Sequence, residues 1–480
     1  MSLAATVALA WLASACAVAE IDRYMLRSAT APVRLEGAGG VLTRAQSQSI
    51  LEGLKKRSPE TSIFDRHVAV EEAIAGNALS VGNRVQLLED GARTYASMLA
   101  AIKAARHSVH METYIFEADE VGNRFAAALA ERARAGVKVK VLYDSVGSAK
   151  TPKEFFNDLA AKGVEVEEFN PVTPAAVMKG ALQHRDHRKL TVVDGRVAFL
   201  GGINISSVYV TGGSSLGGAT ARRGSMGSGA GSGTGSAGAK DDDPPFEKRP
   251  WRDTQVRVEG PVVADLQRAF LKQWARQKKE EYREDKQYFP PLGTQGPLIV
   301  RAIAASPGET NELNALYITL ISAIENAETE IRITNAYFVP HKELLKSLQE
   351  AARRGVDVKL ILPSRTDSWL VHNAGRSFYE DLLEAGVKIY ERKTRLLHAK
   401  TATVDGVWST VGSTNLDWRS LVYNDELNAV VLGPEFAAQV NAMFDKDLAD
   451  PQEITRESWS RRPLQDRVKE LTARAWGRLL

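Results

Sequence analysis

The sequence predicts an α/β protein built from two copies of one domain. Stretches with helical periodicity alternate with short runs of β-branched residues, and the whole pattern occurs twice along the 480 residues. The repeat is visible in the letters, because ERARAGVKVKVL in the first half matches EAARRGVDVKLIL in the second nearly position for position. A chain of this length is expected to hold two to four domains, so two duplicated domains fit.

Each half is expected to follow the same order of helices and strands. In the first half the expected elements are helix 95–105, strand 109–116, helix 124–135, strand 137–142, a helix ending at Gly163 and strand 164–169. In the second half they are helix 316–327, strand 331–339, helix 342–354, strand 356–362, a helix ending at Gly386 and strand 387–390. Helices that connect strands in this way produce layered sheets that are partly parallel.

The composition is that of a globular protein with a large core. Hydrophobic residues make up 44% of the chain and charged residues 25%, which excludes collagen-like, coiled-coil and wholly disordered chains. The formal net charge is +3, from 62 Lys and Arg against 59 Asp and Glu, so no basic excess motivates nucleic-acid binding. The single cysteine, Cys16, excludes an internal disulfide framework and a cysteine-based structural zinc site.

Residues 1–19 form an apolar run that approaches membrane-spanning length. The run fits three interpretations: a secretory signal peptide cleaved after Ala19, a lipoprotein signal that ends before Cys16, or a short membrane anchor. A buried N-terminal helix is the alternative that involves no membrane. Each of the first three interpretations takes the protein to a membrane or across it.

The rest of the chain divides into an extension and two domains. We expect an N-terminal extension over 20–79, a first domain over 80–290 and a second domain over 291–450. Gly, Ser and Ala dominate an insertion at about 211–245. We interpret this insertion as a disordered loop, because it cannot bury enough apolar surface to offset the entropy of ordering it.

The segment 451–480 has the pattern of a basic amphipathic helix. Its apolar residues recur at helical spacing along one stripe: Leu464, Val468, Leu471, Ala475 and Leu479. Arginines surround the stripe, and Trp459 and Trp476 are candidate anchors at an interface. Such a helix either lies on an anionic bilayer or packs against the second domain.

Chemically reactive residues recur at one spacing in both halves. Counting from a histidine, both copies place Lys at +2, Asp at +7, Gly at +14 and Asn at +17. The residues are His187, Lys189, Asp194 and Asn204 in the first half, and His398, Lys400, Asp405, Ser413 and Asn415 in the second. Two such matches at equivalent positions of a duplicated fold are not credibly a coincidence, so these residues form the candidate site.

The spacing indicates a phosphate site without a metal. Residues two apart on a strand share a face, so His187 and Lys189 are expected to point into one cleft, as are His398 and Lys400. If the two halves meet about a pseudo-two-fold axis, two imidazoles and two ammonium groups surround one anionic group between them. Lysine and asparagine donors suit phosphate oxygens, while one imidazole attacks phosphorus and the other transfers protons to and from the alcohols.

Carboxylates that could orient the histidines recur as well. Asp253 and Glu426 each stand seven residues before a Gly-Pro pair, at the start of an expected strand. A carboxylate bonded to an imidazole fixes its tautomer and stabilises its cationic form. We expect Asp253 to pair with His187 and Glu426 with His398; the alternative is an ordinary solvated acid at each strand start.

With these motifs the sequence resembles the phospholipase D superfamily, whose signature is a pair of H-x-K-x4-D motifs followed by G-G/S-x-N. The resemblance covers about residues 80–450, and METYIF, AYFVP and NDELNAVVLGP are similar to segments of bacterial cardiolipin synthases. It implies two phospholipase D-like α/β domains packed about a pseudo-two-fold axis with the active site between them. It further implies a covalent phosphohistidine intermediate with His187 as the nucleophile, and no metal or other cofactor.

The resemblance also assigns the remaining motif residues. It implies that Asp194 and Asp405 are scaffold residues rather than acids in the chemistry. Asn204, Ser413 and Asn415 match the polar positions on the phosphate side of the family's site.

The function implied by the resemblance is transfer of a phosphatidyl group between two phosphatidylglycerol molecules, with release of glycerol. Two alternatives stay open: hydrolysis to phosphatidic acid by the same site, and a phosphodiesterase acting on nucleic acid. The near-neutral charge and the apolar N-terminus argue against nucleic acid. The expected partners are therefore a phospholipid substrate and an anionic membrane surface, at the bacterial inner membrane or its periplasmic face.

Overall fold

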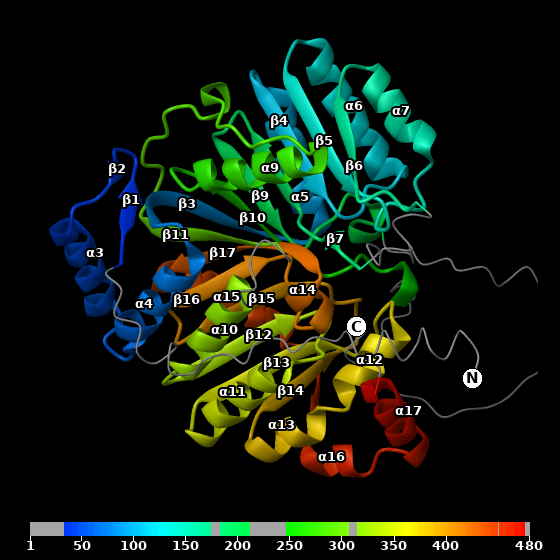
Figure 1. Cartoon of the computed structure of the whole chain (residues 1–480). Helices are drawn as coiled ribbons and strands as arrows, with labels where there is room; N and C mark the ends of the chain where they lie inside the picture. Colours follow the sequence, from blue (N-terminus) through cyan, green and yellow to red (C-terminus); the bar gives the residue numbers. More distant parts are fainter. Residues whose placement is uncertain (1–32, 174–182, 212–245, 307–313, 450, 476–480) are drawn as a thin grey trace, which may run out of the picture.

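The computed structural model of the chain describes residues 33–173, 183–211, 246–306, 314–449 and 451–475. Two α/β halves with the same order of elements lie against each other, one coloured from blue to green and one from green to orange (Figure 1). The apolar run 1–19 and nearly all of the Gly/Ser-rich insertion lie outside the described residues, and so do the interpretations attached to them.

The helices and strands expected from the sequence all occur. In chain order the first half contains β3 (Leu79–Glu89), α5 (Asp90–Ala104), β4 (Ser108–Thr113), α6 (Glu120–Arg134), β5 (Lys138–Asp144), α7 (Lys153–Ala161), β6 (Glu165–Phe169), β7 (Arg185–Asp186), β8 (Leu190–Val193), β9 (Val197–Gly201), β10 (Thr254–Glu259) and α9 (Val263–Lys278). The second half contains β11 (Leu298–Ala305), α10 (Ala315–Glu325), β12 (Glu330–Asn335), α11 (Lys342–Arg353), β13 (Asp357–Pro363), α12 (Trp369–Arg376), α13 (Tyr379–Ala385), β14 (Lys388–Arg392), β15 (Lys400–Val404), β16 (Trp408–Gly412), α14 (Trp418–Val422), β17 (Asn424–Leu432) and α15 (Pro434–Asp447).

The two halves have the same strand order. The first sheet runs β6-β5-β4-β8-β9-β10-β3, and the second runs β14-β13-β12-β15-β16-β17-β11. In each sheet the first three strands are parallel, as expected for strands connected by helices, and the others are antiparallel. β3 and β11 pair with each other in antiparallel register and join the sheets. Equivalent strands therefore meet at the centre, which is the arrangement a pseudo-two-fold relation between the halves requires.

A shared apolar core holds the halves together at this junction. Phe270 of α9 and Val256 of β10 pack in one cluster with Val300 of β11 and with Val431 of β17. All four side chains are buried. Because residues of both halves fill one core, the junction is part of the fold rather than a contact between independent domains.

The N-terminal elements precede the first half in sequence but cover the second. They are β1 (Leu35–Gly37), β2 (Gly40–Val41), α3 (Arg44–Arg57) and α4 (Ile63–Ala75). Phe64 and Val68 of α4 share a core with α10 and with the second sheet. Arg301 of β11, which is completely buried, donates a hydrogen bond to Glu72 of α4, so a buried ion pair adds to this apolar contact.

The C-terminal segment contains more than the expected helix. Residues 451–475 form β18 (Pro451–Ile454), which pairs with β14, and then α16 (Arg456–Ser460) and α17 (Leu464–Ala475). Thr455 caps α16, and Pro463 lies between the two helices, where it cannot continue a helical hydrogen-bond ladder. Of the helices in the described ranges, none has both the length and the apolar content needed to cross a bilayer.

Candidate active site

Both H-x-K segments lie at the boundary between the halves. His187 and Lys189 directly precede β8, which is antiparallel to β4, so they lie at the carboxyl end of β4. The segment at His398 has the same place relative to β12, because Lys400 pairs with Asn335 at the carboxyl end of that strand. The topology thus brings the two motifs to the same edge of the joined sheets.

Backbone hydrogen bonds connect each motif to the opposite half. The N–H of His187 donates to the carbonyl of Asp425 at 3.0 Å, where β7 runs parallel to the start of β17. The N–H of His398 donates to the carbonyl of Arg252 at 2.8 Å, just before β10. Each histidine therefore lies beside the first residues of the acid-bearing strand of the other half.

This crossing corrects the expected pairing of acids and histidines. Nδ1 of His398 lies 2.7 Å from an Oδ of Asp253, and Nδ1 of His187 lies 3.1 Å from an Oε of Glu426. We expected Asp253 to pair with His187 and Glu426 with His398, which is wrong. Sequence proximity within a half suggested that pairing, whereas the contact between the halves decides the real one.

The lysines lie on the same side of the backbone as their histidines. Nζ of Lys189 donates to the carbonyl oxygen of His187 at 2.6 Å, and Nζ of Lys400 donates to that of His398. All four side chains are enclosed: His187 is 7% exposed, His398 is 5% exposed, and both lysines are buried. A ligand that reaches the imidazoles therefore meets both ammonium groups in a site with little water.

Burial shifts the pKa values of these groups. It lowers the pKa of Lys189 to about 7 and that of Lys400 to about 8. Burial, together with the charges of both lysines and of His398, lowers the pKa of His187 well below its ordinary value. Burial also raises the pKa of Glu426 to about 7. An anion that enters such a site favours the protonated lysines, because it supplies the counter-charge that burial withholds.

Aromatic rings enclose the histidines. The ring of Tyr114 lies edge-on to His187, with 5.1 Å between centroids. Tyr337, Tyr209 and Trp251 surround His398, and the hydroxyl of Tyr209 lies 3.3 Å from its Nδ1. Tyr114 and Tyr337 belong to the segments METYIF and AYFVP, which carry the resemblance described above. Tyr209 and Trp251 lie in no such segment, and their only signal is that they stand near the two ends of the Gly/Ser-rich insertion.

The motif aspartates lie at the opposite ends of their strands from the histidines. Asp194 accepts backbone hydrogen bonds from residues 106–108 at 2.7 to 2.9 Å, and Asp405 accepts them from residues 328–330 at 2.8 to 3.1 Å. Both have positive φ, 52° and 50°, in the tight turn that follows the motif strand. In the structure they tie these turns to the start of β4 and β12, which is a scaffold role.

The other polar motif residues have partners within the protein. Asn204 accepts from the N–H of Ile115 at 3.1 Å and donates to the hydroxyl of Tyr209 at 3.0 Å. Ser413 donates its hydroxyl hydrogen to Glu426. Asn415 is buried, and its Oδ1, which can only accept a hydrogen bond, has no hydrogen-bond partner among the described residues.

The glycine at +14 of each motif has a steric cause. A Cβ on Gly201 would lie 2.4 Å from the carbonyl oxygen of Thr254, and a Cβ on Gly412 would lie 1.9 Å from Oδ1 of Asn428. A side chain there would push the acid-bearing strands β10 and β17 away. Glycine is required because these strands must pass close enough to present Asp253 and Glu426.

Behind His187 lies a buried polar group that the sequence analysis did not predict. The carboxylate of Asp425 accepts from Gln273 at 2.8 Å, pairs with Arg276 and lies 3.1 Å from Nε2 of His184. The contact holds β17 in place one residue before Glu426.

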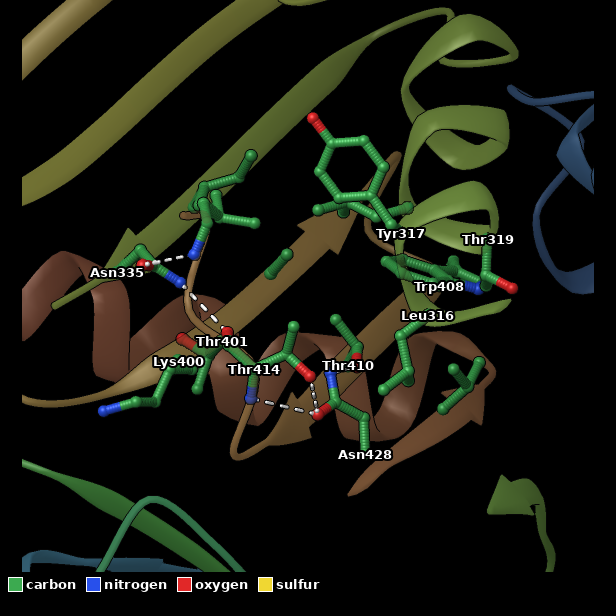
Figure 2. Close-up of a pocket in the computed structure, with 15 residues that line it drawn as sticks. Leu316, Tyr317, Thr319, Asn335, Lys400, Thr401, Trp408, Thr410, Thr414 and Asn428 are labelled. Atoms are coloured by element: carbon green, nitrogen blue, oxygen red, sulfur yellow. Dashed lines mark hydrogen bonds between the residues drawn. The ribbon is translucent and has the colours of Figure 1, made fainter. Parts of the chain in front are cut away.

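A small cavity lies under α10, beside the strand that begins at Lys400. Its volume is about 30 Å³, room for one or two waters, and its wall includes Leu320, Trp408 and Val430 under α10. Lys400 is at its edge, but in Figure 2 the ammonium end points away from the cavity. Among the described residues, no group of three or more histidine, cysteine, aspartate or glutamate side chains is arranged to hold a metal ion.

Two facing H-x-K-x4-D segments on a duplicated α/β fold define the phospholipase D superfamily. The family model for the cardiolipin synthase, PLD-like domain matches residues 98–212 and 320–448, one range in each half. The chain belongs to this cardiolipin synthase family and is a phosphatidyltransferase of the phospholipase D superfamily.

Individual relatives agree with this assignment. The cardiolipin synthase of Alkalihalophilus pseudofirmus is 33% identical over 436 residues, which cover 91% of this chain and 79% of that protein. The cardiolipin synthase of Geobacillus kaustophilus is 33% identical over 409 residues, covering 85% and 74%. The crystal structure of the phosphatidylserine synthase of Haemophilus influenzae has the same fold, with a TM-score of 0.60 over 85% of this chain and 97% of that one, at 12% identity.

Proposed function

We propose that the protein makes cardiolipin by transferring a phosphatidyl group from one phosphatidylglycerol to another, at the inner membrane or its periplasmic face. The observation that carries the proposal is the pair of carboxylate-bound imidazoles, His187–Glu426 and His398–Asp253, with two buried lysines between the halves. Two histidines with different tasks are what a double displacement at phosphorus needs.

In the first step His187 is the nucleophile. Glu426 bonded at Nδ1 keeps the proton on that nitrogen and leaves the Nε2 lone pair free. Nε2 attacks phosphorus, the bond from phosphorus to the glycerol oxygen breaks, and Nε2 of His398 gives its proton to that oxygen. The ammonium groups of Lys189 and Lys400 and the amide N–H of Asn415 donate hydrogen bonds to the non-bridging oxygens. These donors stabilise the negative charge on the oxygens in the transition state.

In the second step the roles of acid and base reverse. The hydroxyl oxygen of the second phosphatidylglycerol attacks phosphorus, and His398, which is now neutral, accepts the proton of that hydroxyl. The bond from phosphorus to Nε2 of His187 breaks, and both histidines return to their starting state. Asp253 stabilises the cationic form of His398 between the steps.

The test is the product formed by purified protein on phosphatidylglycerol vesicles. The proposal requires cardiolipin and glycerol in equal amounts. Phosphatidic acid with no cardiolipin would show that water is the acceptor and would reject the transfer. The His187→Ala variant, prepared in the same way, controls for contaminating activity.

A further inference from the structure

The outer face of α17 is apolar although the helix packs against the protein. Ala473 is buried against Val371 and Ala374 of α12. Glu470, on the same side of the helix, is buried and pairs with Arg462 at 3.0 Å. The helix thus uses a small residue and an ion pair for its intramolecular contact, while Leu464, Val468 and Leu471 of its apolar stripe are exposed. Figure 1 shows α17 beside α12.

The exposed apolar residues of the molecule are concentrated around this helix. In the described part of the chain the exposed large apolar side chains are Val41, Val146, Val172, Trp369, Leu464, Val468 and Leu471. Three of these belong to α17, with Leu464 75% and Leu471 72% exposed, and Trp369 begins the adjacent α12. Isolated exposed apolar residues are ordinary, whereas a contiguous group of them marks an interaction surface.

These residues share an edge of the fold with the active site. Val146 follows β5, Val172 follows β6 and Trp369 follows β13, all at carboxyl ends of parallel strands. The carboxyl ends of β4 and β12 hold the H-x-K segments at this same edge. Of the exposed apolar residues named above, only Val41 lies elsewhere, on the N-terminal hairpin.

A chain of contacts connects α17 to the catalytic imidazole. The ring of Tyr337 lies 6.1 Å from that of His398, and its hydroxyl donates to Asp367, which precedes α12. Tyr337 also packs against the cluster of α12 residues that buries Ala473. The helix that carries the apolar stripe is therefore connected to His398 through α12 and Tyr337.

The charge of the segment suits an anionic surface. Residues 455–475 contain six arginines and lysines against three acidic residues. Arg467, one residue before Val468, and Arg474, three residues after Leu471, lie on one flank of the stripe. An apolar stripe with a basic flank is the pattern of helices that lie in the headgroup region of anionic bilayers.

We infer that this face, formed by Trp369, Leu464, Val468 and Leu471 together with Val146 and Val172 at the same edge of the fold, inserts into the surface of an anionic phospholipid bilayer. The inference rests on the proposed function in taking a membrane lipid as the substrate. A phosphodiester held at a bilayer surface can reach imidazoles that are less than 10% exposed when the edge that carries the H-x-K segments faces that surface. Insertion at this edge orients the enzyme in that way, independently of any contribution from residues 1–32.

The test places one environment-sensitive dye at two matched positions. In a Cys16→Ser background, Leu471→Cys and Val41→Cys carry the dye at sites that are 72% and 69% exposed. On vesicles of equal parts phosphatidylglycerol and phosphatidylcholine, the dye at position 471 should shift to the blue and be quenched by spin-labelled lipid, while the dye at position 41 should not change. Arg467→Gln with Arg474→Gln should weaken binding to these vesicles by about thirtyfold, because each cation near the surface contributes about 1 kcal/mol.

Three outcomes would overturn the inference. They are a water-like spectrum at position 471 on vesicle-bound protein, equal insertion at position 41, and a shift at position 471 that appears without vesicles and grows with protein concentration, which indicates self-association. The readout needs no turnover. An inactive His398→Ala protein should insert in the same way. Loss of insertion would therefore reject the proposed membrane surface, whereas insertion without cardiolipin formation by the unaltered protein would reject only the proposed function.

Discussion

His187 and His398 occupy equivalent motif positions but have different neighbours. His398 is close to the carboxylate of Asp253, at 2.7 Å, and lies next to Tyr209 and Trp251. Asp253 opposes the lowering of its pKa that burial and Lys400 cause. His398 is thus better suited to carry the proton, and His187, with a more strongly lowered pKa, to act as the neutral nucleophile.

The division of roles predicts which variants trap an intermediate. With a phosphatidyl ester of p-nitrophenol, the leaving group needs no proton, so His398→Ala should release a burst of about one equivalent of nitrophenol and then stop. His187→Ala should give no burst. Asp253→Asn should behave like His398→Ala although it lies in the other half, with Glu259→Gln on the same strand as the control. Stopped-flow absorbance measures the burst, and a burst in His187→Ala alone would exchange the two roles.

The buried lysines predict the alkaline side of the pH profile. A lysine whose pKa is lowered to about 7 is protonated below that pH and loses its charge above it. Because phosphate binding needs the charge, kcat/KM should fall as the pH rises from about 7 to 9, whereas kcat should fall only at higher pH, since bound phosphate raises the pKa of Lys189 again. Lys189→Arg stays charged, so its kcat/KM should begin to fall about one pH unit later, where Lys400, with a pKa lowered to about 8, loses its charge. An identical alkaline fall in both proteins would assign it to another group.

At the scale of elements, the sequence alone predicted those features of the fold that depend on local residue patterns. Periodicity predicted the helices and strands, and Gly136 and Gly386, which follow helices with φ of 87° and 96°, marked where helices end. The pairing of β3 with β11 and the crossing of acids to the opposite histidines were not predictable in this way. Both depend on contacts between segments far apart in the chain, which the spacing of residues within one half does not report.

The turn after β15 is an element whose stability effect can be measured. Asp405 accepts hydrogen bonds from three backbone N–H groups and from the hydroxyl of Thr61, at 2.6 Å. Asp405→Ala should lower the free energy of unfolding by about 1–3 kcal/mol, because buried donors lose their acceptor. Asp158→Ala, which removes only an exposed ion pair with Lys162, should change it by less than about 0.5 kcal/mol. Urea unfolding measures both, and equal losses would contradict the scaffold role.

At the scale of the molecule, the shared core and the β3–β11 pairing predict that the halves unfold together. Charged contacts add to the coupling, since Arg252 before β10 pairs with Asp447 at the end of α15, at 2.9 Å. Hydrogen exchange at increasing urea concentration should therefore show amides of β5 and of β13 losing protection at the same concentration, within about 0.3 M. Separate midpoints for the two strands would mean that the halves are independent folding units.

The crossed acid–histidine pairs have a consequence for how such a chain can vary. In a two-fold homodimer, an interface in which each copy completes the site of the other is isologous. Every substitution in such a homodimer appears on both sides of the interface. In a single chain the two sides are free to differ. Counting from the motif asparagine, Tyr209 on the His398 side corresponds to Ser420 on the His187 side, and counting from the acids, Trp251 corresponds to Asn424. Tandem fusion thus permits a division of labour. A tyrosine ring lies beside each histidine, but the His398 side has two further rings at positions where the His187 side has Ser420 and Asn424.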